Sequence, residues 1–106
     1  MKVQYINHMG DDLSVVNAAR VSFGKHKDLM DKSDTKLIHY LAKHNHKSPF
    51  NHAFATFHVK APIFVARQLQ KHEYMPWNEI SRRYVDSEPE FYEPDVWRGR
   101  SEDKKQ

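Results

Sequence analysis

The sequence predicts an α+β domain: a small mixed or antiparallel sheet with helices packed on it, in the order β-α-α-β-α and then irregular. Residues 53–60 alternate strictly between two faces, which is the pattern of a strand. Residues 13–22 and 33–45 carry apolar side chains at helical spacing, and a third helical pattern starts directly after the strand. Because both expected strands are short, one sheet covered by helices is the architecture that follows.

The first half of the chain supplies one strand and two helices. Residues 2–7 alternate as a half-buried strand, and Gly10-Asp11-Asp12 ends it and can cap a helix. In the helix expected at 13–22 the core stripe is Val15, Ala18 and Ala19, with Arg20 off it. Ser33 or Asp34 is expected to cap the second helix, and Asn45 to end it. Its core-facing side chains are expected to be Leu37, Ile38, Leu41 and Ala42.

The second half begins with a turn and a strand. Ser48-Pro49 is typical of an N-cap followed by proline at the first helical position. The strand at 53–60 comes next, and a helix follows from Pro62, with Val65, Ala66 and Leu69 toward the core. We expect this helix to end before Pro76, because the residue ahead of a proline avoids the helical conformation. The later residues are acidic and proline-punctuated.

Composition limits the function classes. The 106 residues suffice for one domain, which we expect at 1–98, with a polar charged tail at 99–106. No apolar run approaches the roughly 20 residues of a membrane helix, and the first residues lack a signal peptide's apolar segment. There is no cysteine, which excludes disulfides and thiolate catalysis and fits a cytoplasmic protein. The net charge of +3 favours anionic partners, either nucleic acid or a phosphate-bearing metabolite.

The histidines and the basic residues are the candidate ligand groups. His44, His46 and His52 match no zinc spacing, so we expect no metal and at most a hydrogen bond to a ligand. The stretch 67–84 interleaves basic residues with aromatic ones around Asn78-Glu79. Such a set can clamp a phosphate and stack on a ring, although a solvated basic face would use the same residue types. Ser81 lacks a nucleophile elbow, so phosphate binding suits its hydroxyl better than catalysis.

Several motifs in order resemble the N-terminal half of flavin-dependent thymidylate synthases. The resemblance runs from about Val3 to Arg98, and its landmarks are Asn17–Phe23, His46–His52, Phe57–Gln68, Asn78–Tyr84 and Glu90–Tyr92. It implies a partial fold of that family and synthesis of thymidylate from deoxyuridylate (dUMP). It also implies FAD as cofactor, NADPH and methylenetetrahydrofolate as co-substrates, and a homotetramer with shared active sites. No cysteine nucleophile is used in the family, which agrees with this composition.

The resemblance also assigns roles to positions of this sequence. The FAD contacts it implies are His46, Ser48, Lys71, His72, Glu73, Asn78 and Glu79. The dUMP contacts it implies are Gln68, Lys71, Glu79, Ile80, Ser81, Arg82 and Arg83. The arginine with which the family ionises the uracil lies beyond Gln106, so the resemblance assigns no catalytic residue here.

Two departures from the family pattern leave alternatives open. The family's R-H-R-x-x-S reads Lys71-His72-Glu73-Tyr74-Met75-Pro76, which places an anion where the family grips a phosphate-bearing cofactor. Family members also continue well beyond the length of this chain. We therefore expect either half of an enzyme, with a separately encoded C-terminal half as one source of the rest, or an inactive remnant that keeps the fold. A small nucleic-acid-binding module is the weakest alternative, because no known motif of that class is present.

Overall fold

The computed structural model describes residues 1–100 and 102. The elements, in order, are strand β1 (Lys2–Met9), helix α1 (Asp12–Arg20), 3-10 turn η1 (Val21–Phe23), helix α2 (Lys32–Lys43), 3-10 turn η2 (Ser48–His52), strand β2 (Phe54–Lys60) and helix α3 (Ile63–Leu69). Residues 2–59 form one compact unit, and Met1 with residues 60–106 forms another. The expected limits 1–98 and 99–106 stay a prediction, and residues 101 and 103–106 lie outside the described part.

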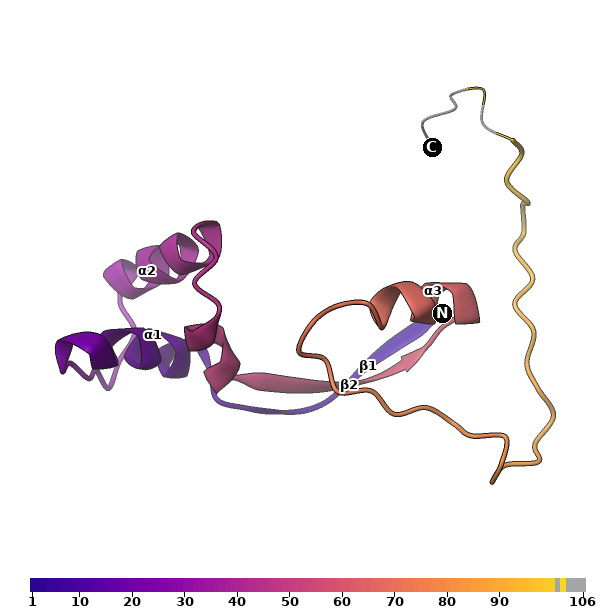
Figure 1. Cartoon of the computed structure of the whole chain (residues 1–106), viewed down its shortest axis with the longest axis horizontal. Helices are drawn as coiled ribbons and strands as arrows, with labels where there is room; N and C mark the ends of the chain where they lie inside the picture. Colours follow the sequence, from indigo (N-terminus) through magenta and orange to yellow (C-terminus); the bar gives the residue numbers. More distant parts are fainter. Residues whose placement is uncertain (101, 103–106) are drawn as a thin grey trace. The chain divides into compact units, whose positions relative to one another are not determined.

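The sheet consists of β1 and β2, which run antiparallel (Figure 1). The rings of Tyr5 and Phe57 meet across the strands edge to face, with centroids 6.1 Å apart. Every residue of β1 is exposed, and in β2 only Val59 is half-buried. The α+β class and the strand at 53–60 are confirmed, but the alternating apolar face has no helix covering it within residues 2–59.

The core of residues 2–59 lies between α1 and α2. Val16 is completely buried, and Val15 and Leu41 are 5% exposed. Asp11 caps α1 by accepting a hydrogen bond from the backbone N–H of Ser14, whose hydroxyl in turn accepts the Asp11 N–H. The expected core stripe of α1 included Val15 but missed Val16. Helix α1 packs against both α2 and η2, so it buries positions that a single stripe does not cover.

Helix α2 begins earlier than the sequence indicated. Asp31 is the N-cap, and its carboxylate accepts hydrogen bonds from the backbone N–H groups of Ser33 and Asp34. The prediction of Ser33 or Asp34 as the cap is therefore wrong. Asp34 is the third residue of the helix and closes a capping box, because its carboxylate accepts the Asp31 N–H at 2.9 Å. Ala42, expected in the core, is exposed.

Helix α2 ends as the sequence predicted. Asn45 has φ +57°, in the left-handed region that asparagine tolerates. The N–H of His46 donates to the carbonyl of Leu41 at 2.9 Å, and the N–H of Asn45 donates to Ala42 at 3.3 Å. This pair of bonds is a Schellman motif with Asn45 at C′. The motif satisfies two carbonyls of the last turn and reverses the chain toward η2.

Turn η2 packs against the start of α1 through Gly10. Gly10 has φ +75°, and a Cβ at this position would lie 2.6 Å from the carbonyl oxygen of His52. The expected cap of this turn is wrong: the N-cap is Lys47 rather than Ser48, no side chain caps the turn, and Pro49, which is buried, is its second residue rather than its first. The segment that carries Ser48 is thus placed by close backbone packing, not by a serine cap.

Helix α3 is shorter than predicted. It ends at Leu69, well before Pro76, and tight turns follow in which the N–H groups of Lys71 and His72 donate to Gln68 and Leu69. Tyr74 then has φ +62°, which no helix accommodates. Pro62 is the N-cap rather than a residue of the first turn. The stripe predicted for this helix is half-buried, at Val65, Ala66 and Leu69.

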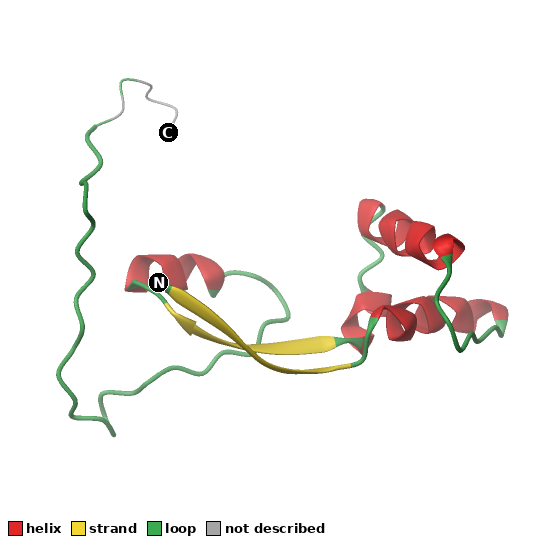
Figure 2. Ribbon diagram, turned by 180° about the vertical axis from the view of Figure 1, so that it is seen from behind, coloured by secondary structure: helices red, strands yellow, loops and turns green. Residues whose placement is uncertain are grey.

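After α3 the described chain forms no further helix or strand and continues as the long loop of Figure 2. In the part of the chain that the structure describes, no helix combines the length and apolarity that crossing a bilayer requires.

Candidate nucleotide-binding site

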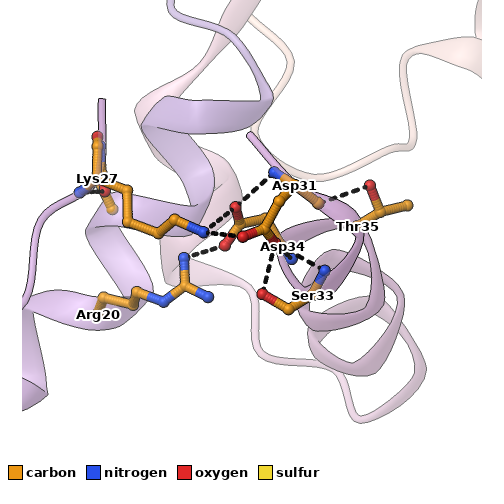
Figure 3. Close-up of polar contacts among 7 residues, drawn as sticks. Arg20, Lys27, Asp31, Ser33, Asp34 and Thr35 are labelled. Atoms are coloured by element: carbon orange, nitrogen blue, oxygen red, sulfur yellow. Dashed lines mark hydrogen bonds and ion pairs between the residues drawn. The ribbon is translucent and has the colours of Figure 1, made fainter. Parts of the chain in front are cut away.

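A buried carboxylate organises the helix pair of residues 2–59 (Figure 3). Asp34 is completely buried, and it accepts hydrogen bonds from the guanidinium of Arg20 and from Nζ of Lys27 at 2.7 Å. Lys27 Nζ also lies 2.6 Å from Asp31. The Lys27 ammonium holds the pKa values of both Asp31 and Asp34 well below the usual range of a carboxyl. Arg20, expected to lie off the core stripe of its helix, is therefore the partner of a buried charge.

Asn17 fixes the loop that supplies Lys27. Its side-chain amide donates to the Lys27 carbonyl at 2.9 Å, and its amide oxygen accepts the Lys27 N–H at 2.9 Å. This two-point pairing imitates a strand ladder. Two residues of the motif Asn17–Phe23 thus have structural roles. Asn17 holds the loop in place through Lys27, and Arg20 neutralises the charge of Asp34. Both could have been suspected from their polarity beside a core stripe.

The two expected FAD contacts of this unit lie at the end of α2. The His46 ring meets Tyr40 edge to face with centroids 5.9 Å apart, and Tyr40 also lies 4.3 Å from the His44 ring. Ser48 is exposed at the start of η2, and its carbonyl accepts a hydrogen bond from Nδ1 of His52 at 3.0 Å. Among the described residues no group of three potential ligands could hold a metal ion.

The other expected contacts lie in residues 60–98. Gln68 is exposed on α3, and Lys71, His72 and Glu73 are exposed in the turns that follow it. The Nδ1–H of His72 donates to the carbonyl of Leu69 at 3.1 Å, so Nε2 is the nitrogen that faces away from the helix end. The cationic and acidic side chains of the tripeptide are thus presented by a turn rather than by the helix that the sequence indicated.

The loop 78–84 is built around a turn at Ser81. The Ser81 hydroxyl oxygen accepts the backbone N–H of Arg83 at 3.2 Å, and its carbonyl accepts the N–H groups of Tyr84 and Val85. Asn78 and Ile80 are exposed beside it. The Arg82 guanidinium donates to the carbonyl of Ser87, which draws it along the backbone.

Arg83 and Glu79 also have local partners. The Arg83 guanidinium carbon lies 5.6 Å from the centroid of the Tyr84 ring, and the indole N–H of Trp77 donates to Glu79 at 3.3 Å. Arg83 therefore keeps its N–H donors available while its face rests on a ring. A hydroxyl and two guanidinium groups within three residues form a set that suits a phosphate.

The groove that the structure shows in this unit lies outside these residues. It is lined by residues 61–64, 90–92, 94 and 96–98, and none of the expected FAD or dUMP contacts is among them. Its Glu90 forms an ion pair with Lys60 at 2.6 Å, which lowers the pKa of the Glu90 carboxyl. The landmark Glu90–Tyr92 thus has a structural role that sequence reasoning did not foresee.

Comparison with known proteins assigns the chain to a family. The family model described as thymidylate synthase complementing protein matches residues 4–106. The chain belongs to this family. It is 50% identical over 97 residues to a flavin-dependent thymidylate synthase of Pseudothermotoga lettingae, a match covering 91% of this chain and 43% of the relative. A Thermus thermophilus enzyme of the same name is 47% identical over 104 residues, covering 98% of this chain and 38% of the relative.

Solved structures agree with the family. The UMP/dUMP methylase PolB from Streptomyces cacaoi, bound with 5-Br dUMP, superposes with a TM-score of 0.68 at 41% identity. That match covers 80% of this chain and 37% of PolB. This member of the thymidylate synthase complementing protein family therefore spans less than half the length of the relatives it matches. The resemblance inferred from the motifs is confirmed as family membership.

Proposed function

We propose that the chain carries the dUMP- and flavin-contacting part of a flavin-dependent thymidylate synthase. The observation that carries this proposal is the turn at Ser81. It places the Ser81 hydroxyl, the Arg82 and Arg83 side chains and the Glu79 carboxylate within five residues of sequence. A phosphate accepts from the first three, and a carboxylate can accept from a sugar hydroxyl or a ring N–H. The family match covers these positions, and a structural relative is described as bound with 5-Br dUMP.

For the reaction, the proposal assigns dUMP to Gln68, Lys71, Glu79, Ile80, Ser81, Arg82 and Arg83. It assigns FAD to His46, Ser48, Lys71, His72, Glu73, Asn78 and Glu79. A flavin, when bound, supplies the hydride, NADPH reduces it, and methylenetetrahydrofolate supplies the carbon. The described residues orient these groups and hold their charge. Other subunits of a homotetramer with shared sites, or a separately encoded C-terminal half, would supply further groups for the reaction.

The fit to FAD is uneven along the tripeptide. Lys71 and the exposed Nε2 side of His72 suit a phosphate or a ring oxygen. Glu73 does not suit a phosphate, because two anions repel, by about 4 kcal/mol at 4 Å and an effective dielectric near 20. It suits a hydroxyl or an N–H of the cofactor. This mismatch favours, as a second candidate, a chain that binds the nucleotide without catalysing the reaction.

The proposal is tested by dUMP binding to the whole chain, measured by calorimetry. We expect saturable binding that weakens at least about tenfold in Arg83→Gln. The control is Arg100→Gln, which removes the same charge outside the proposed site. Equal weakening in both variants would indicate non-specific attraction, and a chain that does not bind dUMP contradicts the proposal. Binding of dUMP without any uptake of FAD supports the non-catalytic candidate.

A further inference from the structure

Residues 60–98 contain an exposed groove with aromatic walls, which we call the aromatic groove. One side is the start of α3, with Ile63 and Phe64, and the other is the irregular segment 90–98. Its aromatic lining residues are Phe64, Phe91, Tyr92 and Trp97, and Arg98 also lines it. None of these residues belongs to the proposed dUMP or FAD contacts, so the groove needs its own explanation.

The groove has specific contacts that hold its two sides together. The Lys60 ammonium lies 2.6 Å from the Glu90 carboxylate. The rings of Phe64 and Tyr92 meet edge to face, with centroids 5.6 Å apart and planes at 65°. Such aromatic pairs contribute beyond the area that they bury. The segment is thereby attached to the end of β2 and the first turn of α3.

The walls are too exposed to enclose a small molecule. Phe64 is 63% exposed, Phe91 83% and Trp97 78%. Ligand pockets bury most of a ligand's surface, roughly 70–90%, between walls that are themselves largely covered. Contiguous aromatic surface at this level of exposure is instead typical of a protein–protein contact, in which tryptophan and tyrosine dominate the binding energy.

The lengths of the relatives provide a candidate for the polypeptide that covers the groove. The family match extends over residues 4–106 and so includes the groove, whereas this chain covers only 43% or 38% of the relatives' length. The relatives therefore present these positions within chains more than twice as long. Arg98 adds a charge criterion, because among the described residues it has no hydrogen-bond or ion-pair partner.

We propose that the aromatic groove is the docking surface for a polypeptide equivalent to the part of the relatives that this chain does not match, on the same chain or a separate one. That polypeptide places apolar side chains against Phe64 and Trp97 and a carboxylate near Arg98. The inference rests on family membership and on the groove, and not on catalysis or nucleotide binding.

The test uses the whole 106-residue chain and a named probe. The probe is the unmatched part of the Pseudothermotoga lettingae relative, produced as a separate polypeptide. Binding is measured by light scattering after gel filtration and by titration. The groove variant is Trp97→Ser, and the matched control is Phe23→Ser. Both side chains are 78% exposed, but Phe23 belongs to η1, in the unit of residues 2–59, and not to the groove. We expect a one-to-one complex that Trp97→Ser weakens at least about tenfold and Phe23→Ser leaves within about twofold.

A second measurement covers failure of the probe to fold alone. A chimera carries this chain in place of the matched part of the same relative, and hydrogen exchange is followed by mass spectrometry. We expect slow exchange at residues 61–64 and 90–98 in the chimera and fast exchange in the chain alone. Fast exchange at these residues in the chimera would overturn the inference. So would a homo-oligomer of the chain alone that Trp97→Ser dissociates and Phe23→Ser does not, because the occupant would then be a second copy. Neither measurement depends on dUMP, so failure of the proposed function would be seen separately.

Discussion

The Arg20 guanidinium donates to the carboxylate of Asp34, which is completely buried where α1 meets α2. Lys27 approaches the other carboxylate oxygen at 2.7 Å, and the Asp31 backbone N–H donates to the same oxygen at 2.9 Å. A buried carboxylate is tolerated only when its lone pairs are filled in this way. This cluster connects Arg20 at the end of α1 and Lys27 in the following loop to Asp34 in the first turn of α2.

Asp34→Asn should therefore destabilise residues 2–59. The amide replaces one carboxylate oxygen by an NH2 donor, so either Arg20 or Lys27 would lose its acceptor, and the negative charge that both cations face would be removed. We expect this variant to unfold at a clearly lower urea concentration than the wild type, with the midpoint of unfolding measured by circular dichroism at 222 nm. Asp28→Asn is the control, because that carboxylate is exposed and, within the described part of the chain, pairs with His26 alone, at 3.5 Å. Equal midpoints for both variants would show that the buried cluster contributes nothing.

The same cluster predicts how stability depends on pH. The pKa values of Asp31 and Asp34 are lowered in the folded chain, so their contribution is complete above the ordinary carboxyl pKa of about 4 and is lost as the pH falls below it. The pKa of Lys27 is raised by Asp31 and Asp34, so its contribution is lost only above its ordinary value of 10.5. We expect the melting temperature to fall below about pH 4 in the wild type and to fall less in Asp34→Asn.

Gly10→Ala should disrupt the joint between α1 and η2. A Cβ would lie 2.6 Å from the His52 carbonyl oxygen, and φ is +75°. Overpacking and left-handed strain together should lower the free energy of unfolding by roughly 3 kcal/mol. Gly24→Ala is the matched control, since its φ is +63° but nothing lies within 4 Å of the new Cβ. It should lose only about 1 kcal/mol in the same denaturation assay. Similar losses for the two variants would contradict the close packing at Gly10.

Asn45→Ala should weaken the end of α2. Alanine in the left-handed conformation at φ +57° is less favourable than asparagine by about 1 kcal/mol, whereas Asn45→Gly should be as stable as the wild type or more so. Denaturant unfolding of the three proteins gives the comparison. A glycine variant that is less stable than the alanine variant would show that the amide side chain, rather than the backbone conformation, is what matters.

Glu73→Arg should increase the affinity for FAD if the tripeptide grips a phosphate as proposed. Replacing an anion by a cation beside a phosphate should tighten binding by at least about tenfold, measured by flavin fluorescence. Glu88→Arg makes the same charge change at an exposed position outside the proposed site. If both variants gain affinity equally, the effect is the general charge of the protein, and the position of the tripeptide is not supported.

Local rules were sufficient to predict several elements of this chain. Strand β2 was predicted from its alternating apolar and polar residues, the end of α2 from Asn45, and the apolar stripe of α3 from its helical spacing. Each of these features depends on residues that lie close together in the sequence. Motif order also gave the family, which the comparisons confirmed. The assignment of FAD and dUMP contacts remains a prediction from that resemblance.

Other features depend on contacts between segments that are distant in the sequence. Arg20 and Asp34 are 14 residues apart, and Gly10 meets the backbone of His52 from a different element. No short-range pattern reports such contacts, because burial of a charge or close approach of two backbones depends on how distant segments pack. The early end of α3 and the ion pair of Lys60 with Glu90 belong to the same class. Local preferences specified the elements of this chain, and packing specified which of its charges became structural.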